Sequence, residues 1–233
     1  MRYTAMALDY DGTIARDGVV PGDVLQGLRE LKATGRKLLL VTGRQLEDLL
    51  AAFPGIAVFD CVVAENGGLF YRPDTGESRL LGERPPATLI DALQASGIPL
   101  SVGQTILATI RPFETVVLKC IADQGLALQV VFNKGAVMVL PQGCNKASGL
   151  KFALGELGIS PRNLVAAGDG ENDCALLEMA DYSVATANAV TMLKATADYV
   201  TGATHGEGVL EIIGALVASD LATLPPRAQR CAT

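Results

Sequence analysis

The sequence predicts an α/β protein in which a doubly wound parallel sheet carries an inserted α+β module. Apolar strand-like runs alternate with amphipathic stretches at the start of the chain, the alternation breaks after residue 82, and it resumes after residue 143. Strand–helix–strand alternation is typical of parallel sheets with right-handed crossovers. We therefore expect a core domain from residues 1–82 and 144–220, a module at 83–143 and a flexible tail at 221–233.

The first part of the core is predicted to supply three parallel strands and two helices. Buried strands are expected over three apolar runs, 4–8, 37–41 and 57–64. Amphipathic spacing after Pro21 predicts a helix over 23–33, and a second helix is expected over 45–53. Short apolar segments on both sides of residues 73–76 predict a hairpin.

The inserted module and the second part of the core follow different patterns. In the module, helices at 88–95 and 113–123 alternate with strands, which are expected over 105–110, 128–132 and 136–140. Asn133-Lys134-Gly135 predicts a tight hairpin between the last two strands. Beyond residue 143 the helical and strand patterns alternate again, over 146–157, 164–167, 176–179, 182–185 and 211–217.

Composition and charge exclude several classes of protein. Of the 233 residues, 49% are hydrophobic and 19% are charged, which is a globular profile. The net charge of -6 argues against a nucleic-acid-binding protein, which needs a basic face, so we expect no nucleic-acid partner. No apolar run reaches the roughly 18 residues of a membrane span, and no signal peptide is predicted. We expect a cytoplasmic protein with no membrane partner, and no pattern favours one oligomeric state.

Two carboxylates, Asp9 and Asp11, directly follow the first predicted strand and precede Gly12 and Thr13. In open α/β sheets, ligands bind beyond the carboxyl ends of the strands. An ordinary Asp-Gly turn is the alternative, although the pattern D-x-D-G-T arises by chance only about once in 10⁵ positions. The pair therefore indicates a functional site at this edge of the sheet.

A second strand end carries the sequence Thr42-Gly43-Arg44, where a strand is expected to turn into a helix. The Thr42 hydroxyl and the backbone N–H groups of Gly43 and Arg44 can hold an anion at such a helix N-terminus. A simple helix cap without a ligand is an equally good interpretation of this segment by itself.

A third strand end leads into an acidic loop over 168–173 that includes Asp169 and Asp173. An EF-hand calcium loop is excluded, because its sixth position requires Gly and Cys174 stands there. An acidic loop that faces Asp9 across the sheet edge suits Mg²⁺, which binds a few carboxylates together with water and phosphate oxygens. The alternative is a solvated acidic turn.

Lys146 follows Asn145 at the start of a predicted helix. The helix dipole does not favour a cation at this end, so another interaction has to explain the lysine. A bound phosphate is one such interaction, and a solvated side chain is the alternative.

Taken together, these motifs resemble those of the haloacid dehalogenase superfamily, and of its Cof-like phosphatase branch in particular. That branch includes sugar phosphatases and archaeal phosphoglycolate phosphatases. In order, the motifs are D-x-D-G-T at 9–13, V-T-G-R at 41–44, Lys146 after a long insertion, and G-D-G-E-N-D at 168–173. The resemblance covers residues 3–218 and includes Glu65-Asn66-Gly67-Gly68 and the stretch 184–189. It implies a Rossmann-like core with the module at 83–143 as an α/β cap of the C2B type.

The resemblance also implies roles for individual residues. Asp9 would be the nucleophile that attacks phosphorus and forms an aspartyl-phosphate. Asp11 would protonate the leaving oxygen and then deprotonate the attacking water. Thr42, Lys146 and Asn172 would hold the phosphoryl group or the substrate. The implied cofactor is Mg²⁺, with ligands from the Asp9 side chain, the Asp11 carbonyl and Asp169, and with Asp173 as a ligand or directly behind one.

The expected activity is therefore that of a magnesium-dependent phosphomonoesterase acting on a small phosphorylated metabolite, such as a sugar phosphate or a phosphoglycolate-like compound. Two alternatives remain open: a phosphomutase acting on a sugar phosphate, and a regulatory phosphate-binding module of a larger protein. A serine-hydrolase triad is not predicted, because no nucleophile elbow precedes His205, the only histidine.

Substrate preference is expected to depend on polar side chains of the inserted module. The candidates are Arg111, Lys119, Asn133 and Lys134, together with Arg84 at the hinge. One or more of them would reach the leaving group when the module covers the site, which would also exclude large phosphoproteins. The alternative for each is a solvated position on the surface.

Overall fold

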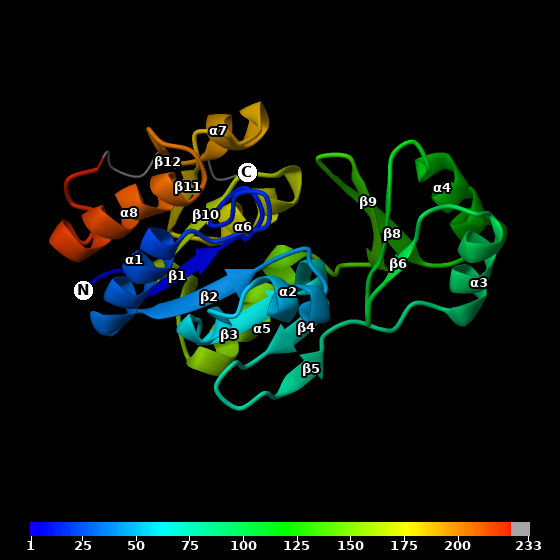
Figure 1. The fold of residues 1–233 in the computed structure, drawn as a ribbon, viewed down its shortest axis with the longest axis horizontal. Helices are drawn as coiled ribbons and strands as arrows, with labels where there is room; N and C mark the ends of the chain where they lie inside the picture. The colour runs from blue at the N-terminus through cyan, green and yellow to red at the C-terminus, as the bar shows by residue number, and fades with distance from the viewer. Residues whose placement is uncertain (225–233) are drawn as a thin grey trace.

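The computed structural model describes residues 1–224 and shows a large α/β domain joined to a smaller one (Figure 1). The large domain is built on an eight-stranded sheet with the order β12-β11-β10-β1-β2-β3-β4-β5. Six of its strands are parallel, whereas β4 and β5 are antiparallel. In chain order the strands are Ala5–Leu8 (β1), Lys37–Val41 (β2), Cys61–Ala64 (β3), Leu69–Tyr71 (β4), Ser78–Leu80 (β5), Leu164–Gly168 (β10), Tyr182–Ala185 (β11) and Tyr199–Val200 (β12).

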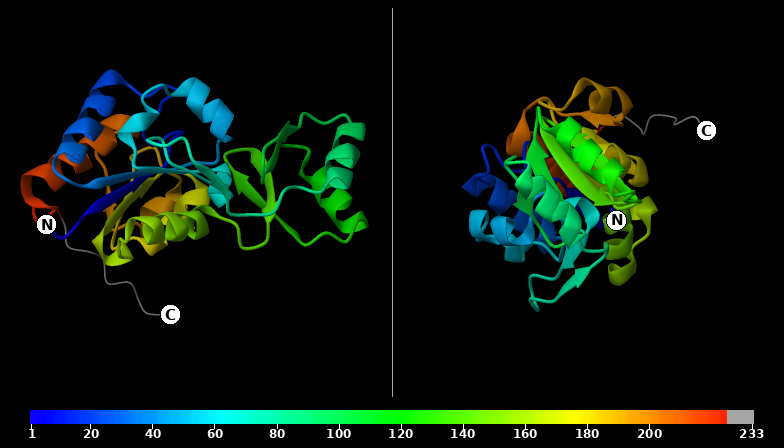
Figure 2. Two further views of the ribbon diagram at one scale, coloured as in Figure 1. Left: turned by 90° about the horizontal axis from the view of Figure 1, so that it is seen from below. Right: turned by 90° about the vertical axis from the view of Figure 1, so that its right-hand side faces the viewer.

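Helices cover both faces of this sheet, which confirms the predicted doubly wound fold (Figure 2, left). One face carries Gly22–Ala33 (α1), Leu46–Ala52 (α2) and His205–Ser219 (α8). The other carries Lys146–Leu157 (α5), Cys174–Met179 (α6) and Thr191–Thr196 (α7). The strand order extends in both directions from β1, so the sheet has its topological switch point at the carboxyl end of this strand.

The inserted module forms the smaller domain, residues 83–143, which we call the cap. Its antiparallel sheet has the order β6-β7-β9-β8, with strands Ser101–Val102 (β6), Leu107–Ile110 (β7), Leu128–Asn133 (β8) and Ala136–Pro141 (β9). Helices Ala87–Ala95 (α3) and Glu114–Asp123 (α4) pack on one face and enclose a small core of their own. Met138 lies in a second cluster of apolar side chains, and a Cβ atom built on Gly43 of the large domain would lie 3.6 Å from its sulfur.

Two predicted strands are shorter than the apolar runs suggested. Residues Ile56–Val58 form a 3₁₀ helix (η1), and the third strand begins only at Cys61. The Asp60 side chain, directly before this strand, accepts the Leu38 N–H at 2.9 Å. The predicted strand 105–110 begins at Leu107 because the preceding N–H groups donate to a side chain of the large domain. The short elements β6, α7 and β12 were not predicted.

Three further 3₁₀ turns complete the described elements, at Glu65–Gly67 (η2), Pro161–Asn163 (η3) and Glu171–Asp173 (η4). After α8 the chain folds back in a turn that buries Leu221 against the main core. The rest of the expected tail, from residue 225 on, lies outside the described residues. Within residues 1–224, no helix is long and apolar enough to cross a lipid bilayer.

Candidate active site

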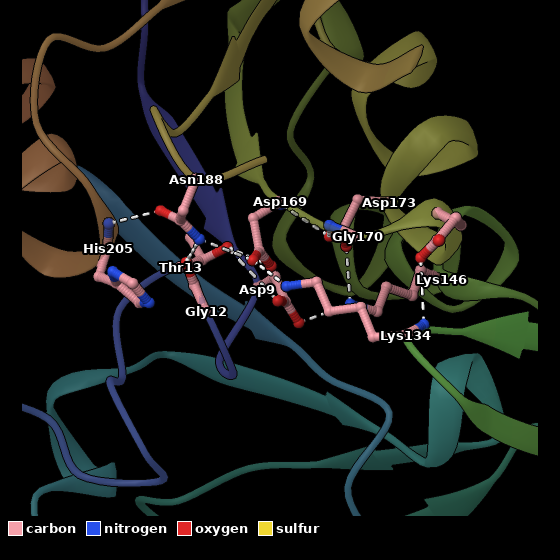
Figure 3. A network of polar contacts seen from close by, with 11 residues as sticks. Asp9, Gly12, Thr13, Lys134, Lys146, Asp169, Gly170, Asp173, Asn188 and His205 are labelled. Carbon is pink, nitrogen blue, oxygen red and sulfur yellow. Dashed lines mark hydrogen bonds and ion pairs between the residues drawn. The ribbon is translucent and has the colours of Figure 1, made fainter. Parts of the chain in front are cut away.

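Three buried aspartates meet at the switch point of the sheet (Figure 3). Asp9 follows β1, Asp169 follows β10, and Asp173 ends η4. One carboxylate oxygen from each lies within 4.8 Å of the others. The close approach depends on Gly12, whose φ of +86° is left-handed and whose Cβ atom, if present, would lie 2.1 Å from the Asp169 carboxylate. The structure therefore brings together the carboxylates that the sequence placed on two separate strands.

Lys146 lies inside this cluster and is 1% exposed. Its Nζ is 2.5 Å from Asp9 Oδ1 and 2.7 Å from Asp173 Oδ1. Helix α5 begins at this lysine because the Asn145 side chain caps the helix by accepting the Ser148 N–H at 2.9 Å. The two carboxylates thus explain a cation at a helix end whose dipole does not favour one.

The electrostatics of the cluster follow from burial. Burial and, after it, the charge of Asp173 raise the pKa of Asp9 to about 8, although Lys146 opposes both. Burial also raises the pKa of Asp169, against the ion pair with Lys134. For Lys146, burial by itself would lower the pKa, but Asp173 and Asp9 raise it above its usual value. The lysine stays charged, and without a cation the burial of the cluster disfavours the ionised form of Asp9.

Asp169 is held by side chains from three other parts of the chain. Asn188 Nδ2 donates to its Oδ2 at 2.9 Å and to the Gly12 carbonyl at 2.8 Å. Thr13 Oγ1 lies 3.4 Å from Asp169 Oδ1. The third partner is Lys134 of the cap, whose ammonium group forms an ion pair with Asp169 Oδ2. These contacts fix the orientation of the carboxylate, and the predictions had assigned a role in the site to neither Thr13 nor Asn188.

The cluster fits a hard divalent cation. Its donors are carboxylate oxygens from Asp9, Asp169 and Asp173, the ligands that Mg²⁺ and Ca²⁺ prefer. Burial and the charge of Asp173 disfavour the ionised form of Asp9, and a bound cation would favour it. Of the predicted ligands, these three residues can therefore hold Mg²⁺ through their side chains.

The Asp11 carboxylate lies outside this buried cluster. Its side chain is 49% exposed and accepts two hydrogen bonds from Arg44, at 2.6 Å from Nε and 2.7 Å from Nη2. The Arg44 guanidinium also stacks over the Tyr10 ring, 5.0 Å from its centroid. In this structure the Arg44 side chain therefore binds Asp11 at the rim, whereas the predicted anion donor of this residue is its backbone N–H.

The other predicted anion-binding residues lie around Asn66, a left-handed residue in η2 with φ 54°. Asn66 donates its backbone N–H to the Thr42 carbonyl at 2.9 Å. Its side-chain oxygen accepts from Asn172 Nδ2 at 3.0 Å, and a Cβ atom on Gly43 would lie 3.8 Å from the same nitrogen. Asn66 Nδ2 and Asn172 Oδ1 are buried without a hydrogen-bond partner among the described residues. Two buried polar atoms thus remain available beside the carboxylates.

Of the five cap candidates, Lys134 and Asn133 approach the site. Lys134 and Gly135 are consecutive left-handed residues, with φ 47° and 91°, as a two-residue type I′ hairpin turn requires. This turn points the β8–β9 tip at Asp169, and the Lys134 N–H donates to Glu171 at 3.2 Å. Asn133 Oδ1 lies beside Gly170.

The other three cap candidates contact the cap itself or the hinge. Arg111 stacks on the ring of Phe132 at 5.2 Å, and the exposed Lys119 pairs with Asp123 at 2.8 Å. Arg84 lines a hollow beside the connection between the domains.

Comparison with known proteins agrees with this architecture. The family model described as haloacid dehalogenase-like hydrolase matches residues 6–99 and 120–213. A phosphoglycolate phosphatase of Methanothermobacter thermautotrophicus is 33% identical over 219 residues, which cover 90% of this chain and 96% of that protein. A haloacid dehalogenase-like hydrolase from Bacteroides thetaiotaomicron superposes with a TM-score of 0.79 at 20% identity, over 92% of this chain and 99% of that one. A subclass IIB sugar phosphatase of the superfamily gives 0.74 at 19% identity, over 92% and 99% of the two chains.

The structure is that of a Rossmann-like α/β domain with an inserted cap and a buried carboxylate cluster at its switch point. The chain belongs to the haloacid dehalogenase-like hydrolase family. The predicted family, fold and enzyme class, a phosphoric monoester hydrolase, are thereby confirmed.

Proposed function

We propose that this enzyme is a magnesium-dependent phosphomonoesterase that releases phosphate from a small phosphorylated metabolite through an aspartyl-phosphate. The observation that carries the proposal is the buried cluster of Asp9, Asp169 and Asp173 around Lys146 at the switch point of the sheet. A buried nucleophile, an adjacent fixed ammonium and a set of carboxylates for a hard cation are the parts that phosphoryl transfer needs.

In the proposed reaction, Asp9 attacks phosphorus, and the bond from phosphorus to the leaving oxygen breaks. Asp11 gives its proton to that oxygen, and water then attacks the aspartyl-phosphate while Asp11 takes a proton from it. Lys146 and Thr42 hold phosphoryl oxygens, with Asn172 beside them. Mg²⁺ bound by the carboxylates would neutralise charge on the phosphoryl group, so that a carboxylate can approach it. The acid–base role requires the Asp11 carboxylate to turn from Arg44 toward the leaving group.

The cap supports a small, anionic leaving group. Met138 of the cap lies against Gly43, and the Lys134 ammonium pairs with Asp169. A carboxylate on the leaving group could form an ion pair with the Lys134 ammonium, whereas a neutral sugar could not. Among the expected substrates this favours a phosphoglycolate-like compound, in keeping with the phosphoglycolate phosphatases among the similar proteins.

Phosphate release over a panel of phosphorylated metabolites tests the proposal. Wild type and Asp9→Asn are each assayed with Mg²⁺ and with EDTA. We expect release that requires Mg²⁺, is highest for small anionic compounds, and is lost in Asp9→Asn. Full activity of Asp9→Asn would contradict the proposed nucleophile, and transfer of phosphate to a second sugar hydroxyl would indicate a mutase instead.

A further inference from the structure

The cap loop Gly103–Ile106, between β6 and β7, is seated on a buried carboxylate of the large domain. Glu65 is 1% exposed and accepts the backbone N–H groups of Gln104, Thr105 and Ile106, at 3.0, 2.6 and 3.2 Å. The Thr105 hydroxyl adds a fourth hydrogen bond at 2.9 Å. Successive backbone N–H groups form an anion-binding concavity, and here the anion is Glu65.

Two glycines permit this close contact between the domains. A Cβ atom on Gly68 would lie 1.8 Å from Thr105 Oγ1, and one on Gly103 would lie 3.0 Å from the Glu65 carboxyl group. Glu65 itself has a left-handed backbone with φ 52°, a conformation that non-glycine residues seldom adopt. Backbone strain and tight packing are therefore combined at a contact that lies outside the carboxylate cluster.

The residue after Glu65 faces the catalytic centre. Asn66 binds Asn172 through its side chain and Thr42 through its backbone N–H. Glu65 therefore contacts the cap, and the next residue, Asn66, contacts two predicted phosphate-binding residues, Thr42 and Asn172. Any shift of Glu65 is transmitted to them over a single peptide unit.

The cap sheet connects Glu65 with the tip that carries Lys134. In the β7–β9 register, Leu107 pairs with Val139 beside the Glu65 contact, whereas Ile110 pairs with Ala136 beside the turn that holds Lys134. One end of the sheet is thus held by Glu65, and the opposite end reaches Asp169. A hydrogen-bonded sheet is stiff, so fixing one end determines where the other end lies.

We infer that Glu65 is a positioning residue, which anchors the near end of the cap sheet and thereby places Lys134 over the catalytic carboxylates. The inference rests on the proposed function for its kinetic consequence, but not for the anchoring itself. Without the carboxylate, the buried N–H groups of Thr105 and Ile106 and the half-buried N–H of Gln104 lose their acceptor, and an unpaired buried N–H is costly in a protein interior.

Two variants of the anchor and one control test the inference. Glu65→Ala removes the acceptor, and Gly68→Ala leaves Glu65 in place but adds a methyl group against Thr105. The control, Gln45→Ala, removes another hydrogen bond between the domains, the exposed one from Gln45 Nε2 to Ser101 at 2.7 Å. Each protein is examined by amide hydrogen exchange of the loop 104–106 and by kinetics on phosphoglycolate and on p-nitrophenyl phosphate.

We expect exchange of the three loop amides to accelerate about tenfold or more in both anchor variants, since the bonds lost are to a charged acceptor. We expect kcat/KM for phosphoglycolate to fall about tenfold, mainly through KM, with a smaller fall for the aryl phosphate. Gln45→Ala should match wild type in both measurements. If Glu65→Ala does not fold, Gly68→Ala carries the test.

Unchanged exchange of the loop amides in the anchor variants would overturn the anchoring role. Faster exchange with equal losses on both substrates would overturn the link to Lys134. If wild type releases no phosphate from either compound, the proposed function fails, and hydrogen exchange then decides on the anchor separately.

Discussion

The burial of Asp9, which the proposed reaction uses, lowers the stability of the folded protein when this carboxylate is ionised. Asp9 is 5% exposed, and burial raises its pKa to about 8, compared with about 3.9 for a free side chain. A carboxyl group whose pKa is higher in the folded state stabilises that state when protonated. This stabilisation is complete below the pKa that the group has in the unfolded chain. It is lost as the pH rises toward the pKa that the group has in the folded protein. Asp9, the proposed nucleophile, therefore destabilises the metal-free protein at neutral pH.

We expect Asp9→Asn to unfold at a higher temperature than wild type in EDTA at pH 8, because the amide carries no charge to bury. The gain should be at least about 2–4 °C, the shift that 1 kcal/mol produces in a domain of this size. It should shrink as the pH falls from 8 toward 4. Thermal denaturation followed by circular dichroism measures it, and a lower Tm for the variant at every pH would contradict the argument.

Cation binding is expected to stabilise the same cluster. With Mg²⁺ at about 100 times its Kd, the folded state should gain about 2.7 kcal/mol, which raises the Tm of wild type. Asp169→Asn should lose most of this gain, because it removes a charged donor. Differential scanning calorimetry with and without Mg²⁺ measures both proteins, and Asp91→Asn on the exposed surface of α3 is the control. Equal gains in all three proteins would argue against a site at Asp169.

At the scale of elements, helix α5 determines where Lys146 lies. Its first turn packs on the segment η2, and Gly149 makes that contact possible. A Cβ atom on Gly149 would lie 2.4 Å from Val63 Cγ1 and 2.7 Å from Gly67 Cα. The position of the buried ammonium group therefore depends on a glycine one turn farther along the same helix.

Gly149→Ala should lower the free energy of unfolding by about 1–3 kcal/mol, as overpacking does, and should reduce activity by displacing Lys146. The matched control is Gly155→Ala on the same helix, where an added methyl group meets nothing within 4 Å. That change should stabilise the protein by up to about 1 kcal/mol through helix propensity. Urea denaturation and phosphatase assays of both variants test this pair, and similar stabilities would refute it.

At the scale of the whole molecule, the site is complete only when the two domains are docked. The core domain supplies the carboxylates and Lys146, whereas the cap supplies Met138 above Gly43 and Lys134 beside Asp169. In the proposed function, the core domain would carry out the reaction and the cap would select the substrate. Such a division would let the cap exclude large phosphoproteins while the nucleophile stays unchanged.

Lys134→Ala should therefore lower kcat/KM more for phosphoglycolate than for p-nitrophenyl phosphate. Loss of a hydrogen bond between charged groups should lower kcat/KM for the anionic substrate by about 10-fold or more. Lys119→Ala, which removes an exposed cap cation that pairs with Asp123 on α4, should have equal and small effects on both substrates. Steady-state kinetics of the two variants measure this, and equal effects of Lys134→Ala on both substrates would contradict the assignment.

Much of the core domain was predictable because its signals are local. An apolar run predicts a buried strand, and a parallel sheet brings the carboxyl ends of its strands together. Asp9, Asp169 and Asp173 could therefore be placed at one edge, and Lys146 at the start of a helix, before any distance was known. The prediction of a strand over the apolar run 57–64 was wrong for its first residues. The Asp60 side chain there accepts a backbone N–H, and the apolar pattern does not include such hydrogen bonds.

The sequence by itself determined the fold class, the inserted module and the residues of the carboxylate cluster, since motif order and strand ends specify these. Only the tertiary structure decided that Lys134 reaches Asp169, that Glu65 holds the cap, and that Asp11 pairs with Arg44. These contacts join residues more than 30 positions apart through single side chains. Their partners depend on turn geometry and on the docking of two domains, which no local pattern records.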